Sequence, residues 1–81
     1  MSHYGNIEHD TQEGRLYSVL KSNPGQWFDG LYLSQQVRTI ALHTCVHGTR
    51  QQLPAGERIE NKIMYRAVLK RKGSYYRLVV A

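Results

Sequence analysis

The hydrophobic pattern of this chain changes its period at Pro54-Ala55-Gly56, and that change limits the folds that the chain can adopt. Before this point, apolar residues recur at spacings of three and four, as in amphipathic helices. Beyond it, apolar and polar residues alternate up to Lys70-Arg71-Lys72-Gly73, and they alternate again over residues 74–80. Two alternating runs around a glycine-containing turn are typical of a β-hairpin. The sequence therefore predicts an α+β domain in which helices precede a hairpin with a basic turn.

The helical part follows an N-terminal segment that has no apolar periodicity. We expect residues 1–9 to form a flexible tail and residues 10–81 to form one domain, which is the size that an 81-residue chain supports. Asp10 and Glu13 have the spacing of a capping box. That spacing predicts a first helix over residues 11–21.

A short strand and two further helices are expected before the hairpin. Gln26-Trp27-Phe28 favours a short strand, because two large aromatic residues stand between a Pro-Gly turn and a helix start. Asp29 is a suitable cap for a second helix over residues 30–37, and Thr39 for a third helix over residues 41–53. The face of the third helix that we expect to be buried carries Leu42, Cys45, Val46, Thr49 and Leu53.

The charges of the chain are concentrated in its second part. The net charge is +5, but residues 1–30 carry two basic and four acidic side chains, whereas residues 31–81 carry nine basic and two acidic ones. The basic part contains the third helix and the hairpin. A one-sided basic surface is typical of small proteins that bind nucleic acid. A basic domain whose charges are only solvated is the alternative.

The succession of three helices and a basic hairpin resembles a winged helix-turn-helix domain of the small bacterial or bacteriophage type. The resemblance covers about residues 11–80 and includes the short strand after the first helix. The segments that carry it are Leu33-Ser34-Gln35-Gln36-Val37, Thr49-Arg50-Gln51-Gln52-Leu53, Gly56-Glu57-Arg58-Ile59-Glu60-Asn61 and Tyr75-Tyr76-Arg77-Leu78. In such domains the third helix enters the major groove of DNA, and the hairpin, called the wing, contacts the flanking backbone or minor groove.

The resemblance also implies which residues contact DNA. On the third helix the groove contacts fall to Thr44, His47, Arg50 and Gln51. In the wing the backbone contacts fall to Lys70, Arg71 and Lys72. The third helix departs from a strongly basic pattern, since it has a single guanidinium and no lysine.

The chemistry of these side chains suits the two roles. Arginine pairs bidentately with guanine, and glutamine pairs bidentately with adenine. A good pair of this kind favours the correct base over a wrong one by about 1–3 kcal/mol. Each lysine or arginine on a phosphate releases a counterion. Further candidates for phosphate contact are Arg38 near the helix-turn-helix turn and Lys62, Arg66 and Arg77 along the wing. The alternatives are ordinary solvated side chains and, for the hairpin, charges that prevent edge-to-edge aggregation.

Tyr75 is the aromatic residue with a candidate role of its own. Its position in the alternation predicts that it lies beside Arg77 on the outer face of the hairpin. A tyrosine there can stack on a base if the partner is single-stranded.

Metal and enzymatic sites have weaker support in the sequence. His43 and His47 are four residues apart, but Cys45 falls on the other side of a helix, and no further ligand completes a zinc site. The sequence has no phosphate-binding glycine loop, no paired carboxylates and no nucleophile with a recognisable base. We therefore expect a protein that is not an enzyme and that uses neither a metal nor a cofactor.

The chain carries no apolar run of the ~20 residues that span a bilayer, and its first residues, which lack a basic start and an apolar stretch, are not expected to act as a secretory signal. Cys45 is its only cysteine, which fits a reducing compartment. We expect a cytoplasmic protein without a membrane partner. Two copies on adjacent half-sites and a single copy both remain open.

The function that the sequence favours is binding of double-stranded DNA, as a small regulator of transcription or recombination. The alternative is a winged-helix module that binds another protein, for instance an inhibitor of a host nucleic-acid machine. Such a module would depend on exposed apolar residues such as Met64, Val68 and Val79.

Overall fold

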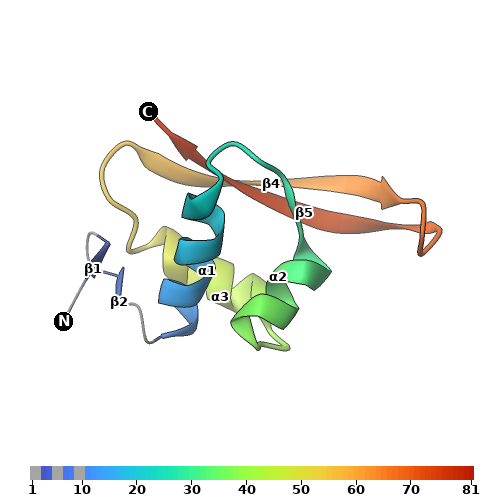
Figure 1. The fold of residues 1–81 in the computed structure, drawn as a ribbon, viewed down its shortest axis with the longest axis horizontal. Coiled ribbons are helices and arrows are strands. Elements are labelled where there is room, and N and C mark those ends of the chain that lie inside the picture. The colour runs from blue at the N-terminus through green and yellow to red at the C-terminus, as the bar shows by residue number, and fades with distance from the viewer. Residues whose placement is uncertain (1–2, 5–6, 9–10) are drawn as a thin grey trace.

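Three helices lie against one face of a three-stranded antiparallel sheet in the computed structural model of this chain, which describes residues 3–4, 7–8 and 11–81 (Figure 1). The helices are α1 (Gln12–Ser22), α2 (Gly30–Val37) and α3 (Leu42–Arg50). The sheet contains β3 (Phe28–Asp29), β4 (Glu57–Arg66) and β5 (Arg71–Val80) in the spatial order β3-β5-β4. The predicted α+β class is confirmed for this described part of the chain.

Two short strands precede α1. They are β1 (His3–Tyr4) and β2 (Ile7–Glu8), which pair antiparallel with each other, and β2 lies close to α1. The predicted tail over residues 1–9 otherwise lies outside the described residues.

The start of α1 differs slightly from the sequence prediction. The N-cap residue is Thr11, whose Oγ1 accepts a hydrogen bond from the amide of Gly14 at 3.0 Å. Asp10, the predicted cap, lies outside the described residues. The helix body agrees with the prediction within one residue at each end.

The helix α2 covers residues 30–37 as predicted, and a short strand is present, but it covers Phe28–Asp29 rather than Gln26-Trp27-Phe28. The Asp29 carboxylate accepts a hydrogen bond from the amide of Leu31 at 2.8 Å, and this caps the helix as predicted. Arg38 ends the helix in the left-handed conformation, with φ of 60°. This tight C-cap turns the chain directly toward α3.

The helix α3 is shorter than predicted at its C-terminal end. It stops at Arg50, whereas the apolar spacing extended it to residue 53. Pro54 disfavours helical geometry for the residue before it, which is Leu53. Thr39 accepts a hydrogen bond from the amide of Ala41, so it closes the turn before the helix rather than capping α3 itself.

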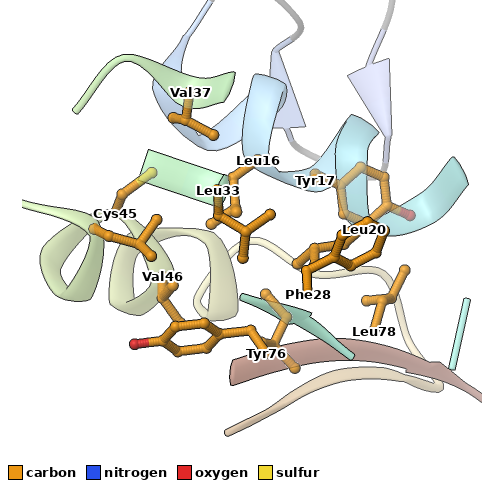
Figure 2. Packing of buried hydrophobic residues seen from close by; sticks show 12 residues of the cluster. Leu16, Tyr17, Leu20, Phe28, Leu33, Val37, Cys45, Val46, Tyr76 and Leu78 are labelled. Atoms are coloured by element: carbon orange, nitrogen blue, oxygen red, sulfur yellow. The ribbon is translucent and has the colours of Figure 1, made fainter. Parts of the chain in front are cut away.

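The core lies between the helices and the covered face of the sheet (Figure 2). Leu16, Leu20, Leu33 and Leu78 are fully buried in it. The rest of the buried apolar cluster is Tyr17, Phe28, Val37, Leu42, Cys45, Val46, Ile59 and Tyr76. Burial of this surface drives the helices onto the sheet, because each helix presents an apolar stripe that has no other partner.

The hairpin turn is the main correction to the sequence prediction. The tip is formed by residues 67–70, because Arg66 pairs with Arg71 across the strands. The predicted turn at Lys70-Arg71-Lys72-Gly73 is therefore wrong, since Gly73 lies within β5 opposite Met64.

The register of the hairpin is set by its buried base rather than by its glycine. Ile59 lies opposite Leu78, and both side chains are buried against the helices. A shift by one residue would turn both of them toward solvent. Lys70 adopts the left-handed conformation, with φ of 53°, that closes the tip without a glycine.

Candidate nucleic-acid interface

The outer face of α3 is polar and exposed. It carries His43, Thr44, His47 and Gln51, and the opposite face of the helix packs into the core. The side-chain nitrogen of Gln51 lies 3.3 Å from Nε2 of His47, so these two side chains form one hydrogen-bonding unit. Three of the predicted groove residues, Thr44, His47 and Gln51, are thus brought together on one accessible surface.

Arg50 does not join this group. Its guanidinium donates two hydrogen bonds to the backbone carbonyl of Ile59, from Nε at 3.2 Å and from Nη2 at 3.0 Å. The side chain therefore bridges the end of α3 to the start of β4. The contact makes Arg50 a connection between helix and wing in this structure, whereas the sequence suggested a base-reading residue.

The basic cluster lies at the far end of the hairpin. Lys70 is in the loop, Arg71 and Lys72 begin β5, and all three are exposed. Figure 1 shows the β4–β5 tip projecting beyond the helices, and the long dimension of the molecule is 42 Å. Within the described part of the chain, no carboxylate forms an ion pair with these three side chains.

Two of the predicted wing cations are engaged in internal ion pairs. The Arg66 guanidinium contacts the Asp29 carboxylate at 2.7 Å, and only 11% of the Arg66 side chain is exposed. Arg77 contacts the Glu60 carboxylate at 2.6 Å, and Glu60 also accepts hydrogen bonds from Arg58. Among the described ion pairs of the wing, Lys62 and the tip cluster therefore have no carboxylate partner.

Lys62, Arg77 and Tyr75 lie on the sheet face that the helices leave open. The register places Lys62 opposite Tyr75, in agreement with the predicted alternation. The Lys62 ammonium lies 5.0 Å from the ring centre of Trp27, and the Arg77 guanidinium lies 4.5 Å from it. The sequence prediction missed this role of Trp27, although the buried position of Phe28 implies that its neighbour points the other way.

Arg38 is exposed at the turn between α2 and α3. Its backbone carbonyl accepts a hydrogen bond from the Gln12 side chain at 3.2 Å, which ties this turn to the start of α1. This hydrogen bond holds the backbone of the turn in place, and the Arg38 side chain is exposed to solvent.

Neighbouring cations and hydrogen-bond donors lower the pKa values of three carboxylates of the sheet. Burial alone would raise the pKa of Asp29, but hydrogen bonds from Arg66 and from the Leu31 amide lower it overall. Burial would also raise the pKa of Glu57, but the hydrogen bonds from Lys21 and Tyr17 outweigh this effect and lower the pKa overall. The hydrogen bonds from Arg77 and Arg58 lower the pKa of Glu60. The acidic groups of the sheet are therefore held as charged partners of particular cations.

The candidate metal ligands are separated in the fold. Cys45 is buried, and burial raises the pKa of its thiol, whereas His43 and His47 are exposed. Within the residues that the structure describes, no group of three histidine, cysteine or acidic side chains is positioned to hold a metal ion.

Within the described ranges, no helix is both long and apolar enough to cross a membrane. No protein-family model, curated protein or solved structure matches this chain.

Proposed function

We propose that this protein is a winged-helix domain that binds double-stranded DNA without catalysis, with α3 in the major groove and the wing tip on the backbone. The order helix, strand, helix, helix, strand, strand and the sheet order β3-β5-β4 are compatible with that family. The observation that carries the proposal is the cluster Lys70, Arg71 and Lys72 at the end of a projecting hairpin, which has no ion-pair partner among the described residues. A nearby linear polyanion is the partner that such a cluster fits best.

The outer face of α3 supports the groove-binding part of the proposal. The helix itself contributes hydrogen-bonding side chains and no carboxylate to this face, and the Glu13 carboxylate of α1 lies beside it at Gly48. Gln51 suits adenine, and Thr44 and His47 suit a base edge or a phosphate. Because Arg50 is held on Ile59, guanine readout by this helix is weak, and most of the affinity comes from the phosphates.

This balance of contacts suits a small regulator of transcription or recombination that acts in the cytoplasm. One domain of this size buries a limited area on DNA. Specific binding is therefore expected to use two copies on neighbouring half-sites.

The test is binding to a random-sequence duplex of 25 base pairs, followed by fluorescence anisotropy over a series of salt concentrations. The variant K70A/R71A/K72A removes the tip cluster and should weaken binding at low salt. If each side chain contacts a phosphate, the slope of log affinity against log salt falls by up to about 3. Arg58→Ala is the control, because Arg58 is an exposed cation at the opposite end of the hairpin.

The same experiment can contradict the proposal. Absence of binding at low salt would exclude it. An equal change of slope in Lys70→Ala and Arg58→Ala would mean that the charge of the whole protein, rather than the wing tip, governs binding.

A protein-binding role is the second candidate, and the exposed apolar residues of the wing favour it. Val68 at the tip is 93% exposed, and Ile63 and Tyr65 are more than half exposed. Met64 and Val79, which the sequence also suggested, are half-buried and contribute less. In this case Val68→Ser would abolish capture of the partner, whereas salt would have little effect.

A further inference from the structure

The sheet has one open face, and that face is strongly charged. All three helices of the described chain lie on the other side (Figure 1). The alternation of β4 and β5, together with the partners of β3, assigns seven charged residues to the open face. Five are basic, namely Arg58, Lys62, Arg66, Arg71 and Arg77, and two are acidic, namely Asp29 and Glu60. The open face therefore has a positive excess even after its internal ion pairs are counted.

An aromatic pocket lies at the edge of this face, where β3 leads into α2. Its volume is about 460 Å³, and it is open to solvent. It is lined by the aromatic residues Trp27, Phe28, Tyr32 and Tyr75, by Asn23 and Gln26, and by Asp29, whose carboxylate is paired with Arg66. Aromatic rings from two strands and a helix thus surround one accessible space.

The geometry of the rings suits a flat ligand. Phe28 and Tyr32 are stacked, with ring centres 6.0 Å apart and planes inclined by 13°. Tyr32 is 45% exposed although it is a large aromatic residue on a helix. A heteroaromatic ring placed beside it would gain the stacking area that Tyr32 now presents to water.

The cations beside the pocket indicate what the flat ligand carries. Lys62 and Arg77 both lie within 5.0 Å of the Trp27 ring centre, next to the pocket. Lys62 has no carboxylate partner among the described ion pairs. Aromatic rings for the bases and cations for the phosphates are the groups with which proteins bind single-stranded nucleic acid.

We propose that this pocket binds an unpaired base of single-stranded nucleic acid, whose neighbouring phosphates lie near Lys62 and Arg77. An apolar peptide side chain could enter the same space, but it would leave Lys62, which has no carboxylate partner among the described ion pairs, without a counter-charge. The proposal does not depend on duplex binding by α3 and the wing tip, because none of its residues belongs to α3 or to the tip cluster Lys70, Arg71 and Lys72.

Trp27 provides the readout, since it is the only tryptophan of the chain and lines the pocket. Its fluorescence is followed during titration with a random-sequence single-stranded octanucleotide and with an abasic octamer of the same length. Stacking predicts that the octanucleotide changes Trp27 emission and binds about tenfold or more tightly than the abasic strand.

The matched variants are Tyr32→Leu in the pocket and Tyr65→Leu on the covered side of the sheet. Both tyrosines are exposed, and both changes keep an apolar side chain. Tyr32→Leu should weaken the octanucleotide about tenfold or more, whereas Tyr65→Leu should leave its affinity within twofold. Far-ultraviolet circular dichroism confirms that both variants are folded.

Equal affinities for the two strands would overturn the proposal, because phosphates alone would then explain binding. Equal losses in Tyr32→Leu and Tyr65→Leu would overturn it as well. Duplex binding measured on the same variants keeps the two proposals separate, because Tyr32→Leu should not change the salt slope on duplex DNA.

Discussion

The guanidinium of Arg66 donates two hydrogen bonds to the carboxylate of Asp29, at 2.8 and 2.7 Å, although the two residues lie on strands separated by β5. The guanidinium passes over Gly73, where a Cβ atom would overlap it. The same carboxylate also caps α2 through the amide of Leu31. One acidic residue thus fastens the wing to the start of a helix, and a glycine in the intervening strand makes the contact possible.

We predict that Gly73→Ala destabilises the protein although alanine normally suits a strand better than glycine does. The added methyl group displaces Arg66 from Asp29, which should lower the free energy of unfolding by about 1–2 kcal/mol. Urea denaturation measures the change. Arg66→Ala should have a similar effect, and in that background Gly73→Ala should be neutral or stabilising. Additive losses in the double variant would contradict the explanation.

The stability of the protein should fall in acid because of Glu57. Its carboxylate accepts hydrogen bonds from Tyr17 at 2.5 Å and from Lys21 at 2.8 Å, and they lower its pKa despite burial. A carboxyl with a lowered pKa stabilises the fold above its ordinary value of 4.5, and this contribution disappears as the pH falls through the folded value.

Denaturation with urea at pH values from 7 to 3 tests this prediction. Glu57→Gln should be less stable at pH 7 and should flatten the acid limb of the profile. Tyr17→Phe removes one of the two donors and should flatten it less. An unchanged acid limb in Glu57→Gln would show that other carboxylates determine it.

At high pH the protein should lose stability because of Tyr17 and Lys21, the partners of Glu57. Burial raises the pKa of Tyr17 above 10.0, and the hydrogen bond with Glu57 raises the pKa of Lys21. Groups with a raised pKa stabilise the fold below their ordinary value, and this contribution is lost as the pH rises through the folded value. We expect stability to decline above about pH 10 in the natural protein, and less steeply in Tyr17→Phe.

Two helical glycines should respond to alanine in opposite ways. A Cβ at Gly48 would lie 3.4 Å from the Glu13 carboxylate, which can move aside, so Gly48→Ala should stabilise α3 by about 0.5–1 kcal/mol. A Cβ at Gly30 would lie 2.9 Å from the backbone carbonyl of Ser74, which cannot. Gly30→Ala should therefore destabilise by about 1–3 kcal/mol. Thermal unfolding of both variants checks the pair, and a destabilised Gly48→Ala would show that α1 and α3 need the close approach.

Substitution of Arg50 can distinguish a structural role of this side chain from a role in reading DNA bases. If its contact with the Ile59 carbonyl is its main role, Arg50→Ala should lower the free energy of unfolding by about 1–2 kcal/mol. Its effect on duplex affinity should be smaller than that of Gln51→Ala at a preferred DNA site. If Arg50→Ala lowered the affinity for DNA without lowering the free energy of unfolding, Arg50 would instead be a residue that contacts bases.

The local elements of this fold are predictable from short stretches of sequence. Asp29 before residues 30–37 gave the cap and the helix, because capping depends on neighbouring residues alone. The alternation after Pro54 gave two strands of the correct type for the same reason. The outer face of α3, with Thr44, His47 and Gln51, follows from helical spacing once the buried face is known.

The chain by itself determined its helices, its strands and the polar face of α3, since these follow from contacts between residues a few positions apart. Only the tertiary structure decided the hairpin register, because it depends on burying Ile59 and Leu78 under the helices rather than on the glycine. The tertiary structure also decided which of the basic side chains form internal ion pairs. Arg66 is bound to Asp29 across 37 positions and Arg77 to Glu60 across 17, and no local pattern encodes such distant partners.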